Sequence, residues 1–248
     1  MPHVARIRGQ SGYYHVVPKG IADQLIFEND EDRKYYLRLL GEAAQQTGIL
    51  VHAYCLMSNH THLVLEDAAG KLPDAMKYLH ERYAMRYASR SGRKGGVFRK
   101  PYWSEPIEND SYLLCAVRYV HANPAAAGIC PASAYTWSSA KDYLGRRGLT
   151  STALVLDLLG GRDGFIAFSA SANSTALPFP GSRLKAHLSD DEAFRIALGI
   201  FGRDGLNLAK ATREERSAAV TCLAQRGFTT RQIARICNIS QSSVARLV

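Results

Sequence analysis

Two histidines, a tyrosine and an asparagine offer the types and spacing that metal-assisted chemistry requires. His60 and His62 are separated by a single residue, so in a β-strand both imidazoles point to the same face and can hold a divalent ion together. An incidental pair of strand histidines has the same spacing. A metal site needs a third ligand, which Asn123 can supply as an amide oxygen, with the Tyr119 hydroxyl one helical turn earlier. A buried tyrosine and a helix C-cap asparagine would explain the same two residues.

Strands and helices in alternation must position these side chains. Hydrophobic periodicity and turn signals predict a mixed α+β pattern. The expected elements are a β-prone run at 13–17, a helix over 30–46, a hairpin of strands 49–56 and 60–66, and helices over 73–89 and 111–121. We expect the last helix to stop at Asn123-Pro124, since a residue before proline is pushed out of the helical region.

A cationic segment over residues 77–100 carries most of the excess charge of the chain, which is +9 overall. It holds eight basic residues against the single acidic residue Glu81, and Arg82, Arg86 and Arg90 recur at helical spacing as one stripe. Tyrosines, Phe98 and Trp103 lie among these charges or follow them. This mixture is typical of surfaces that bind a phosphate backbone and stack unpaired bases, although a solvated helix face is the alternative.

The C-terminal part of the chain shows only helical patterns. We divide the sequence into a catalytic-sized domain at 1–150, an extension and linker at 151–189, and a helical module at 190–248; the best linker candidate is 169–182. A capping box at Thr229 and a cap at Ser240 predict a helix-turn-helix, with a second helix over 241–248 that can face base edges. A plain helical hairpin that packs on the main domain explains the same spacing.

Composition restricts the class of protein further. The chain has 248 residues, 46% of them hydrophobic, which suits a folded protein with its own core. Five scattered cysteines favour reduced thiols and a cytoplasmic location over a disulfide framework. We expect neither a signal peptide nor a membrane span.

Two stretches make the sequence recognisable. Residues 53–66 read AYCLMSNHTHLVLE and residues 118–128 read RYVHANPAAAG. Together they resemble the single-tyrosine HUH transposases, in particular the REP-associated tyrosine transposases. Supporting matches include Tyr14-His15-Val16 and Trp137-Ser138-Ser139, and the resemblance runs over about residues 7 to 145.

This resemblance implies a ferredoxin-like antiparallel sheet with helices on one face, to which the C-terminal patterns add a small all-α module. It implies that His60, His62 and Asn123 bind Mg²⁺ or Mn²⁺, and that Tyr119 attacks DNA to form a 5′-phosphotyrosine. The implied substrate is single-stranded or hairpin DNA with REP-like palindromes, cut by a monomer or a homodimer.

The residues expected to contact nucleic acid come from the start of the chain, the cationic segment and the helical module. They are Lys19, Arg82, Arg86, Arg90, Arg93, Lys94, Arg99, Lys100, Tyr102, Arg231, Gln241, Ser242, Ser243 and Arg246. The module would add contacts to duplex DNA.

Two other functions stay open from the residues. A non-catalytic DNA-binding regulator would keep the fold and read DNA through the helix-turn-helix. A metallohydrolase of small phosphates would use the histidines but leave the cationic segment unexplained. The DNA sequence recognised is not predicted.

Overall fold

A computed structural model describes residues 9–92, 95–170, 211–225 and 228–247, together with the single positions 194, 197 and 208. The chain divides into two compact units, Met1–Ala172 and Asn173–Val248. The expected linker at 169–182 lies outside the described residues except for its first two positions.

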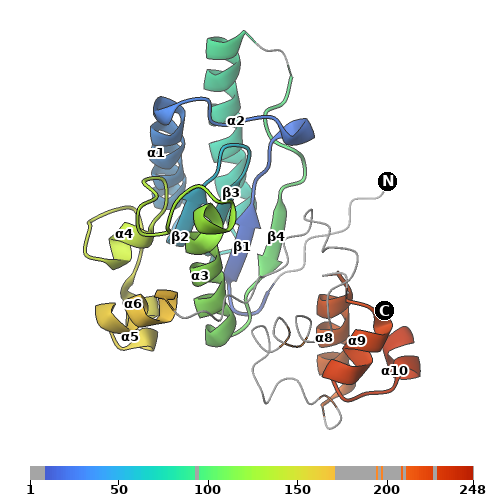
Figure 1. Cartoon of the computed structure of the whole chain (residues 1–248). Coiled ribbons are helices and arrows are strands. Elements are labelled where there is room, and N and C mark those ends of the chain that lie inside the picture. The colour runs from blue at the N-terminus through green and yellow to red at the C-terminus, as the bar shows by residue number, and fades with distance from the viewer. Residues whose placement is uncertain are drawn as a thin grey trace. The chain divides into compact units, whose positions relative to one another are not determined.

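A four-stranded antiparallel sheet forms the centre of the first unit (Figure 1). Its strands are β1 (Tyr13–Val17), β2 (Leu50–Leu56), β3 (Thr61–Glu66) and β4 (Trp103–Pro106), in the spatial order β2-β3-β1-β4. With one helix between β1 and β2 and another between β3 and β4, this is the ferredoxin-like arrangement. The expected α+β class and the β2–β3 hairpin are thus confirmed.

The strand β4 was not expected from the sequence. It has four residues, all of them half-buried, pairs only with β1 among the described strands, and ends in Pro106. A short edge strand of this kind lacks the alternation that identifies longer strands. The cationic segment is therefore followed directly by a strand of the sheet, which begins at Trp103.

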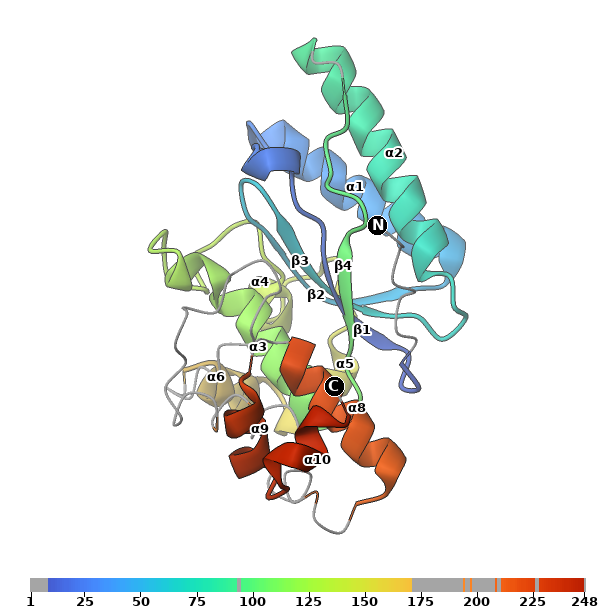
Figure 2. The same ribbon diagram turned by 90° about the vertical axis from the view of Figure 1, so that its right-hand side faces the viewer.

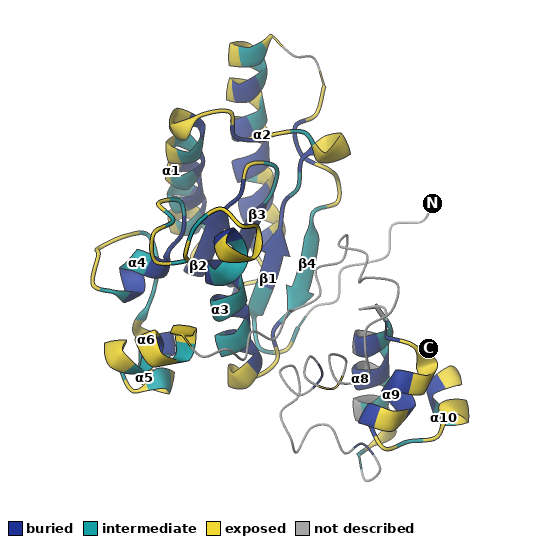
Figure 3. Cartoon of the chain, in the orientation of Figure 1, coloured by how far each residue is buried: buried dark blue, intermediate teal, exposed yellow. Residues whose placement is uncertain are grey.

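Helices α1 (Asp30–Thr47) and α2 (Leu72–Ser91) cover one face of the sheet. The side chain of Asn29 caps α1 by accepting a hydrogen bond from Asp32 N, and Gly48 ends the helix at φ 76°. Buried residues of both helices pack with Leu63 and Leu65 of β3 in one hydrophobic core (Figure 3). Each fully buried leucine contributes about 1.5–3 kcal/mol to this packing.

Helix α3 (Asp110–Ala126) lies on the opposite face of the sheet, against β2 and β3 (Figure 2). Helices α1 and α2 are the helices expected on one face of the sheet. Helix α3 forms an additional layer on the other face. The expected stop at Asn123 was wrong, because Pro124 lies inside the helix. A proline near a helix C-terminus removes one hydrogen bond only, and the helix continues to Ala126. Asn123 is therefore held inside a helical turn.

Three shorter helices complete the first unit: α4 (Ala140–Tyr143), α5 (Ala153–Leu159) and α6 (Arg162–Ala170). Tyr143 of α4 stacks on Phe165 of α6, with ring centroids 4.5 Å apart, and His121 of α3 contacts both rings. The segment expected to be an extension is thus helical up to Ala170, and α6 packs against α3.

The described part of the second unit is helical, with α8 (Arg213–Gln225), α9 (Thr230–Ile236) and α10 (Gln241–Ala245). The capping box of Thr229 and Gln232 is present, and Ser240 caps α10 by accepting from Ser243 N at 3.1 Å. Helix α10 ends at Ala245, earlier than expected. None of the described helices is long and apolar enough to cross a membrane.

Candidate active site

The two histidines of the H-x-H pair lie at the start of β3. His62 pairs with Cys55 across the β2–β3 hairpin, whereas His60 precedes the strand and forms an isolated bridge with Lys19. Their ring centroids are 4.9 Å apart and their planes nearly perpendicular. Both rings therefore lie on the same side of the hairpin, as the spacing predicts.

Helix α3 brings Tyr119 to these histidines. The ring of Tyr119 lies edge-on to that of His62, with centroids 5.4 Å apart. Asn123, one turn later, lies near enough to influence the pKa of both Tyr119 and His62, and its Nδ2 donates to the Tyr119 carbonyl oxygen at 2.8 Å. The structure thus gathers the four residues that the sequence singled out: His60, His62, Tyr119 and Asn123.

Burial keeps both imidazoles neutral. It lowers the pKa of His60 to about 4, with a smaller contribution from the charge of Lys19. Burial also lowers the pKa of His62 well below its usual value, and the neighbouring His15 and His60 add to the effect. A cation ligand must carry a lone pair, so these histidines are in the binding-competent state at neutral pH.

Burial shifts the pKa of Tyr119 in the opposite direction. Burial raises the pKa of its hydroxyl to about 12, and the hydrogen bond with Asn123 offsets only part of this shift. The phenol therefore keeps its proton at neutral pH and is a weak nucleophile by itself. Attack on an ester would need a group that stabilises the developing charge.

The donor set at this place fits a hard or borderline divalent cation. Among the described residues no group of three or more histidine, cysteine or acidic side chains gathers around one point. The candidate ligands are instead two neutral imidazoles and the amide oxygen of Asn123, with substrate oxygens to complete the shell. Mg²⁺ and Mn²⁺ accept such a set, whereas structural zinc favours four protein ligands that often include cysteine.

Lys19 forms a backbone bridge with His60 and its charge acts on that imidazole, and Arg99 lies beside Lys19. The backbone N–H of Arg99 donates to the Lys19 carbonyl oxygen at 2.7 Å, and Lys19 Nζ lies 2.5 Å from Asp23 Oδ1. Gly20 allows the tight turn that follows Lys19, because a Cβ there would clash with the Gln24 carbonyl oxygen. One predicted DNA-contacting residue, Lys19, therefore lies next to the candidate metal site, and a second, Arg99, lies next to Lys19.

The Arg82-Arg86-Arg90 stripe lies elsewhere. Arg82 stacks over Tyr78 at 4.6 Å, and Arg86 over Tyr35 of α1 at 4.3 Å. The stripe thus follows the two helices that cover the sheet face opposite α3. The structure does not bring it to the histidine–tyrosine cluster.

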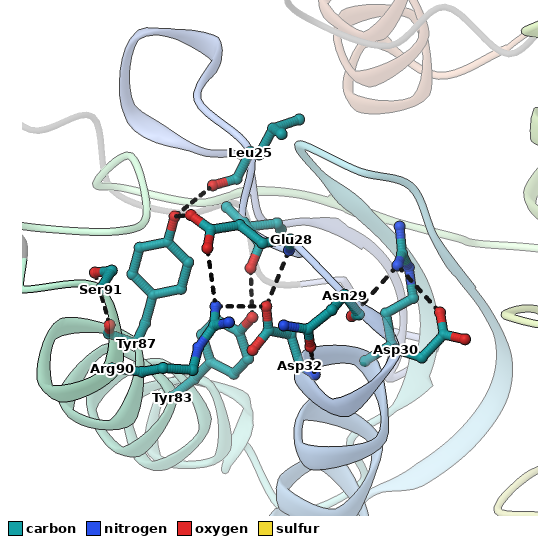
Figure 4. Close-up of polar contacts among 11 residues, drawn as sticks. Leu25, Glu28, Asn29, Asp30, Asp32, Tyr83, Tyr87, Arg90 and Ser91 are labelled. Carbon is teal, nitrogen blue, oxygen red and sulfur yellow. Dashed lines mark hydrogen bonds and ion pairs between the residues drawn. The ribbon is translucent and has the colours of Figure 1, made fainter.

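Arg90 is held in an ion-pair network with α1 and the segment before it (Figure 4). Its guanidinium lies 2.7 Å from Asp32 Oδ2 and 3.2 Å from Glu28 Oε2. Tyr87 donates a hydrogen bond to the same Glu28 at 2.8 Å, while the Asp32 side chain is 4% exposed. Two carboxylates balance the charge of Arg90, so its contact with DNA, which remains a prediction, has little support here.

The other residues of the cationic segment differ in their surroundings. Arg93 and Lys94 lie outside the described residues, and Lys100 is exposed. Tyr102 is half-buried and packs against the core and edge-on to His80, with centroids 5.8 Å apart. Its ring is therefore part of the core packing on α2 rather than an open stacking surface.

The predicted recognition residues of the second unit are mostly exposed. Arg231, Gln241, Ser242 and Arg246 are exposed and Ser243 is half-buried. Arg246 Nε donates to the Ser242 carbonyl oxygen at 3.2 Å, across the end of α10. Whether these side chains contact DNA remains a prediction.

His15 of β1 belongs to the cluster, although no role was predicted for it from the sequence. It is 1% exposed, its Nε2 lies 3.1 Å from His62 Nδ1, and its ring contacts Trp103 and Tyr119 edge-on. The only sequence feature that could have pointed to His15 was its place in the β-prone run at 13–17. It becomes informative only once the pairing of β1 with β3 is known, which sets His15 opposite Val64 and on the face of His62.

Comparison with known proteins identifies a family over part of the chain. Residues 10–123, which include the sheet, both histidines and most of α3, match the family described as "Transposase IS200 like". A solved structure of a REP-associated tyrosine transposase bound to a REP hairpin is similar to 59% of this chain and 87% of that one, with 15% identity and a TM-score of 0.47. No curated protein matches this chain.

Proposed function

Because residues 10–123 match the IS200-like transposase family, we propose that this chain is a DNA endonuclease and strand transferase with Tyr119 as its nucleophile. The observation that supports the proposal is the cluster described above. A tyrosine hydroxyl, two neutral imidazoles and an amide meet on one face of the sheet, with Lys19 and Arg99 beside them. This set can bind a phosphodiester, polarise it and attack it.

His60, His62 and Asn123 would hold a divalent ion, Mg²⁺ or Mn²⁺. Such an ion polarises a phosphoryl oxygen and stabilises the charge that develops on it. The high pKa of Tyr119 makes that assistance necessary, because a protonated phenol attacks phosphorus poorly.

The chain's own residues do the rest of the chemistry. Tyr119 Oη forms a bond to phosphorus as the bond between phosphorus and the 3′ oxygen breaks. The phenol loses its proton, and the departing 3′ oxygen takes up a proton to become a hydroxyl. The products are a 5′-phosphotyrosine and a free 3′-OH. One phosphoester replaces another, so a later 3′-OH can reverse the step and no ATP is needed. Asn123 helps to hold Tyr119 through the hydrogen bond from its Nδ2 to the Tyr119 carbonyl oxygen.

We propose single-stranded or hairpin DNA, with REP-like palindromes, as the substrate. The nucleophile is half-buried between α3 and the sheet, and an unpaired backbone reaches such a place more easily than one wrapped in a duplex. Lys19 and Arg99 would neutralise the phosphates that flank the scissile bond. The exposed residues of α9 and α10 would add contacts to duplex DNA, in a cytoplasmic monomer or homodimer.

The test is strand cleavage with labels on both sides of the cut. A pool of hairpins and unstructured single strands is incubated with the full chain and Mn²⁺, then separated on a denaturing gel. The strand labelled 3′ of the cut should migrate with the protein, and the strand labelled 5′ of it should be released with a free 3′-OH. EDTA should abolish both products.

The alternative function predicts different results. A non-catalytic regulator would bind DNA in EDTA and cleave no strand with Mn²⁺ or Mg²⁺. Binding without cleavage, across a pool that contains palindromic hairpins, would contradict the nuclease proposal.

A further inference from the structure

Two residues outside the proposed ligand set bond to the Nδ1 atoms of the two site histidines. His60 Nδ1 lies 2.7 Å from Asn59 Oδ1, and His62 Nδ1 lies 3.1 Å from His15 Nε2. These are the same atom on each ring. The pairing suggests that Asn59 and His15 share a task.

The bond from Asn59 fixes the proton of His60. An amide oxygen only accepts hydrogen bonds, so His60 Nδ1 must donate. The Asn59 amide nitrogen faces the Asp23 carbonyl oxygen at 3.4 Å, which agrees with its oxygen facing His60. A neutral imidazole has one N–H group, and therefore the lone pair of His60 lies on Nε2.

His15 is placed to do the same for His62. Its ring is buried and lies between Trp103 and Tyr119, at centroid distances of 5.1 Å and 5.8 Å. If His15 carries its own proton on Nδ1, its Nε2 accepts the Nδ1–H of His62. The lone pair of His62 then also lies on Nε2.

We infer that Asn59 and His15 are positioning residues that hold His60 and His62 with the proton on Nδ1, so that both rings present Nε2 to a divalent ion. The inference rests on the proposed function, because it concerns the same metal site. A ligating histidine commonly donates its other N–H to a fixed acceptor, and loss of that acceptor typically weakens metal binding by about 10- to 100-fold.

Metal affinity of the full-length chain provides the first test. Mn²⁺ titrations are compared for the wild type, Asn59→Leu and His15→Phe, which remove the acceptors with little change of volume. Each variant should bind Mn²⁺ about 10- to 100-fold more weakly. Asn59→Asp should restore wild-type affinity, since a carboxylate accepts the same N–H, and His15→Gln should restore part of it.

The matched control is His52→Gln. His52 is a buried histidine of β2 that bonds to Glu66 at 2.8 Å and to the Ser151 carbonyl oxygen at 3.1 Å, and it touches neither His60 nor His62 in the described contacts. This variant should bind Mn²⁺ as the wild type does, even where its melting temperature falls.

The position of the protons provides a second test, independent of activity and of any variant. Nitrogen NMR of the Mg²⁺-loaded wild type should show the proton of both His60 and His62 on Nδ1. A proton on Nε2 of either ring would overturn the inference for that ring. Unchanged Mn²⁺ affinity in folded Asn59→Leu and His15→Phe would overturn it for both, whereas a wild type that binds no Mn²⁺ would contradict the proposed function itself.

Discussion

The ring of Tyr119 packs edge-on against that of His62, with centroids 5.4 Å apart and planes at 88°. The two residues come from different elements, since Tyr119 belongs to α3 and His62 to β3. The packing of α3 on the sheet therefore sets the distance between the proposed nucleophile and the proposed metal site.

Loss of either site histidine should remove metal binding without unfolding the chain. His60→Ala and His62→Ala each delete one of three proposed ligands, so Mn²⁺ affinity should fall by at least about 100-fold. Calorimetric titration measures the affinity, and circular dichroism checks the fold. Wild-type affinity in either variant would exclude that histidine as a ligand.

The cations beside His60 should matter more for DNA binding than the helical stripe. Lys19→Gln together with Arg99→Gln should weaken single-strand binding, and should reduce the slope of log affinity against log salt by about 0.7 for each phosphate that is no longer neutralised. The matched control, Arg82→Gln with Arg86→Gln, removes two charges on the other side of the sheet. A larger effect from the control pair would show that the stripe is the principal surface for DNA.

Arg90 should stabilise the fold rather than bind DNA. Arg90→Met leaves the buried Asp32 carboxylate without its closest cation, 2.7 Å away, and should lower the free energy of unfolding by about 1–3 kcal/mol. Arg82→Met, at an exposed position with no ion pair among the described contacts, should stay within about 0.5 kcal/mol. Urea unfolding distinguishes the two, and equal effects would refute the role of the network.

Stability should fall as the pH drops below about 6.5. Burial lowers the pKa of His121 to about 3, and in the described structure no acceptor faces its Nδ1, so the folded chain excludes a proton that the unfolded chain binds. Between these two pKa values the unfolded state holds more protons, and the free energy of unfolding decreases with acid by up to about 1.4 kcal/mol per pH unit. The lowered pKa values of His60 and His62 act with the same sign.

Urea unfolding of wild type and His121→Gln at pH 7.5, 6 and 5 measures the contribution of His121. The variant should show a shallower dependence on pH, because glutamine does not titrate. An identical dependence of the free energy of unfolding on pH in the two proteins would contradict a contribution from His121.

The sequence predicted the local elements that carry the site better than the contacts between them. The alternation expected for a strand over 60–66 placed His60 and His62 on one face, and helical spacing placed Tyr119 beside Asn123. The role of His15 depended on the register of β1 against β3, which no local pattern reports. The surroundings of the arginine stripe on α2 could not be predicted for the same reason. Charge spacing shows which residues share a helix face, but it does not show that Arg86 packs over Tyr35 of α1.

The end of α3 shows a different limit. A proline signal predicts a stop, but tertiary packing keeps the helix regular through Pro124 when only one hydrogen bond is removed. Asn123 is consequently better fixed than a residue at a frayed helix end, which is what a ligand requires.

The identity of the residue that carries the DNA is the most direct measurement. The covalent adduct formed with Mn²⁺ is digested with nuclease and trypsin, and the peptide 119–141 is sequenced by mass spectrometry. This peptide also contains Tyr135, whose hydroxyl donates to the Leu56 carbonyl oxygen, so Tyr135→Phe is an internal control. A nucleotide remnant on Tyr119, retained in Tyr135→Phe and absent in Tyr119→Phe, is the predicted result. A remnant on any other residue, or an adduct that persists in Tyr119→Phe, would contradict the account.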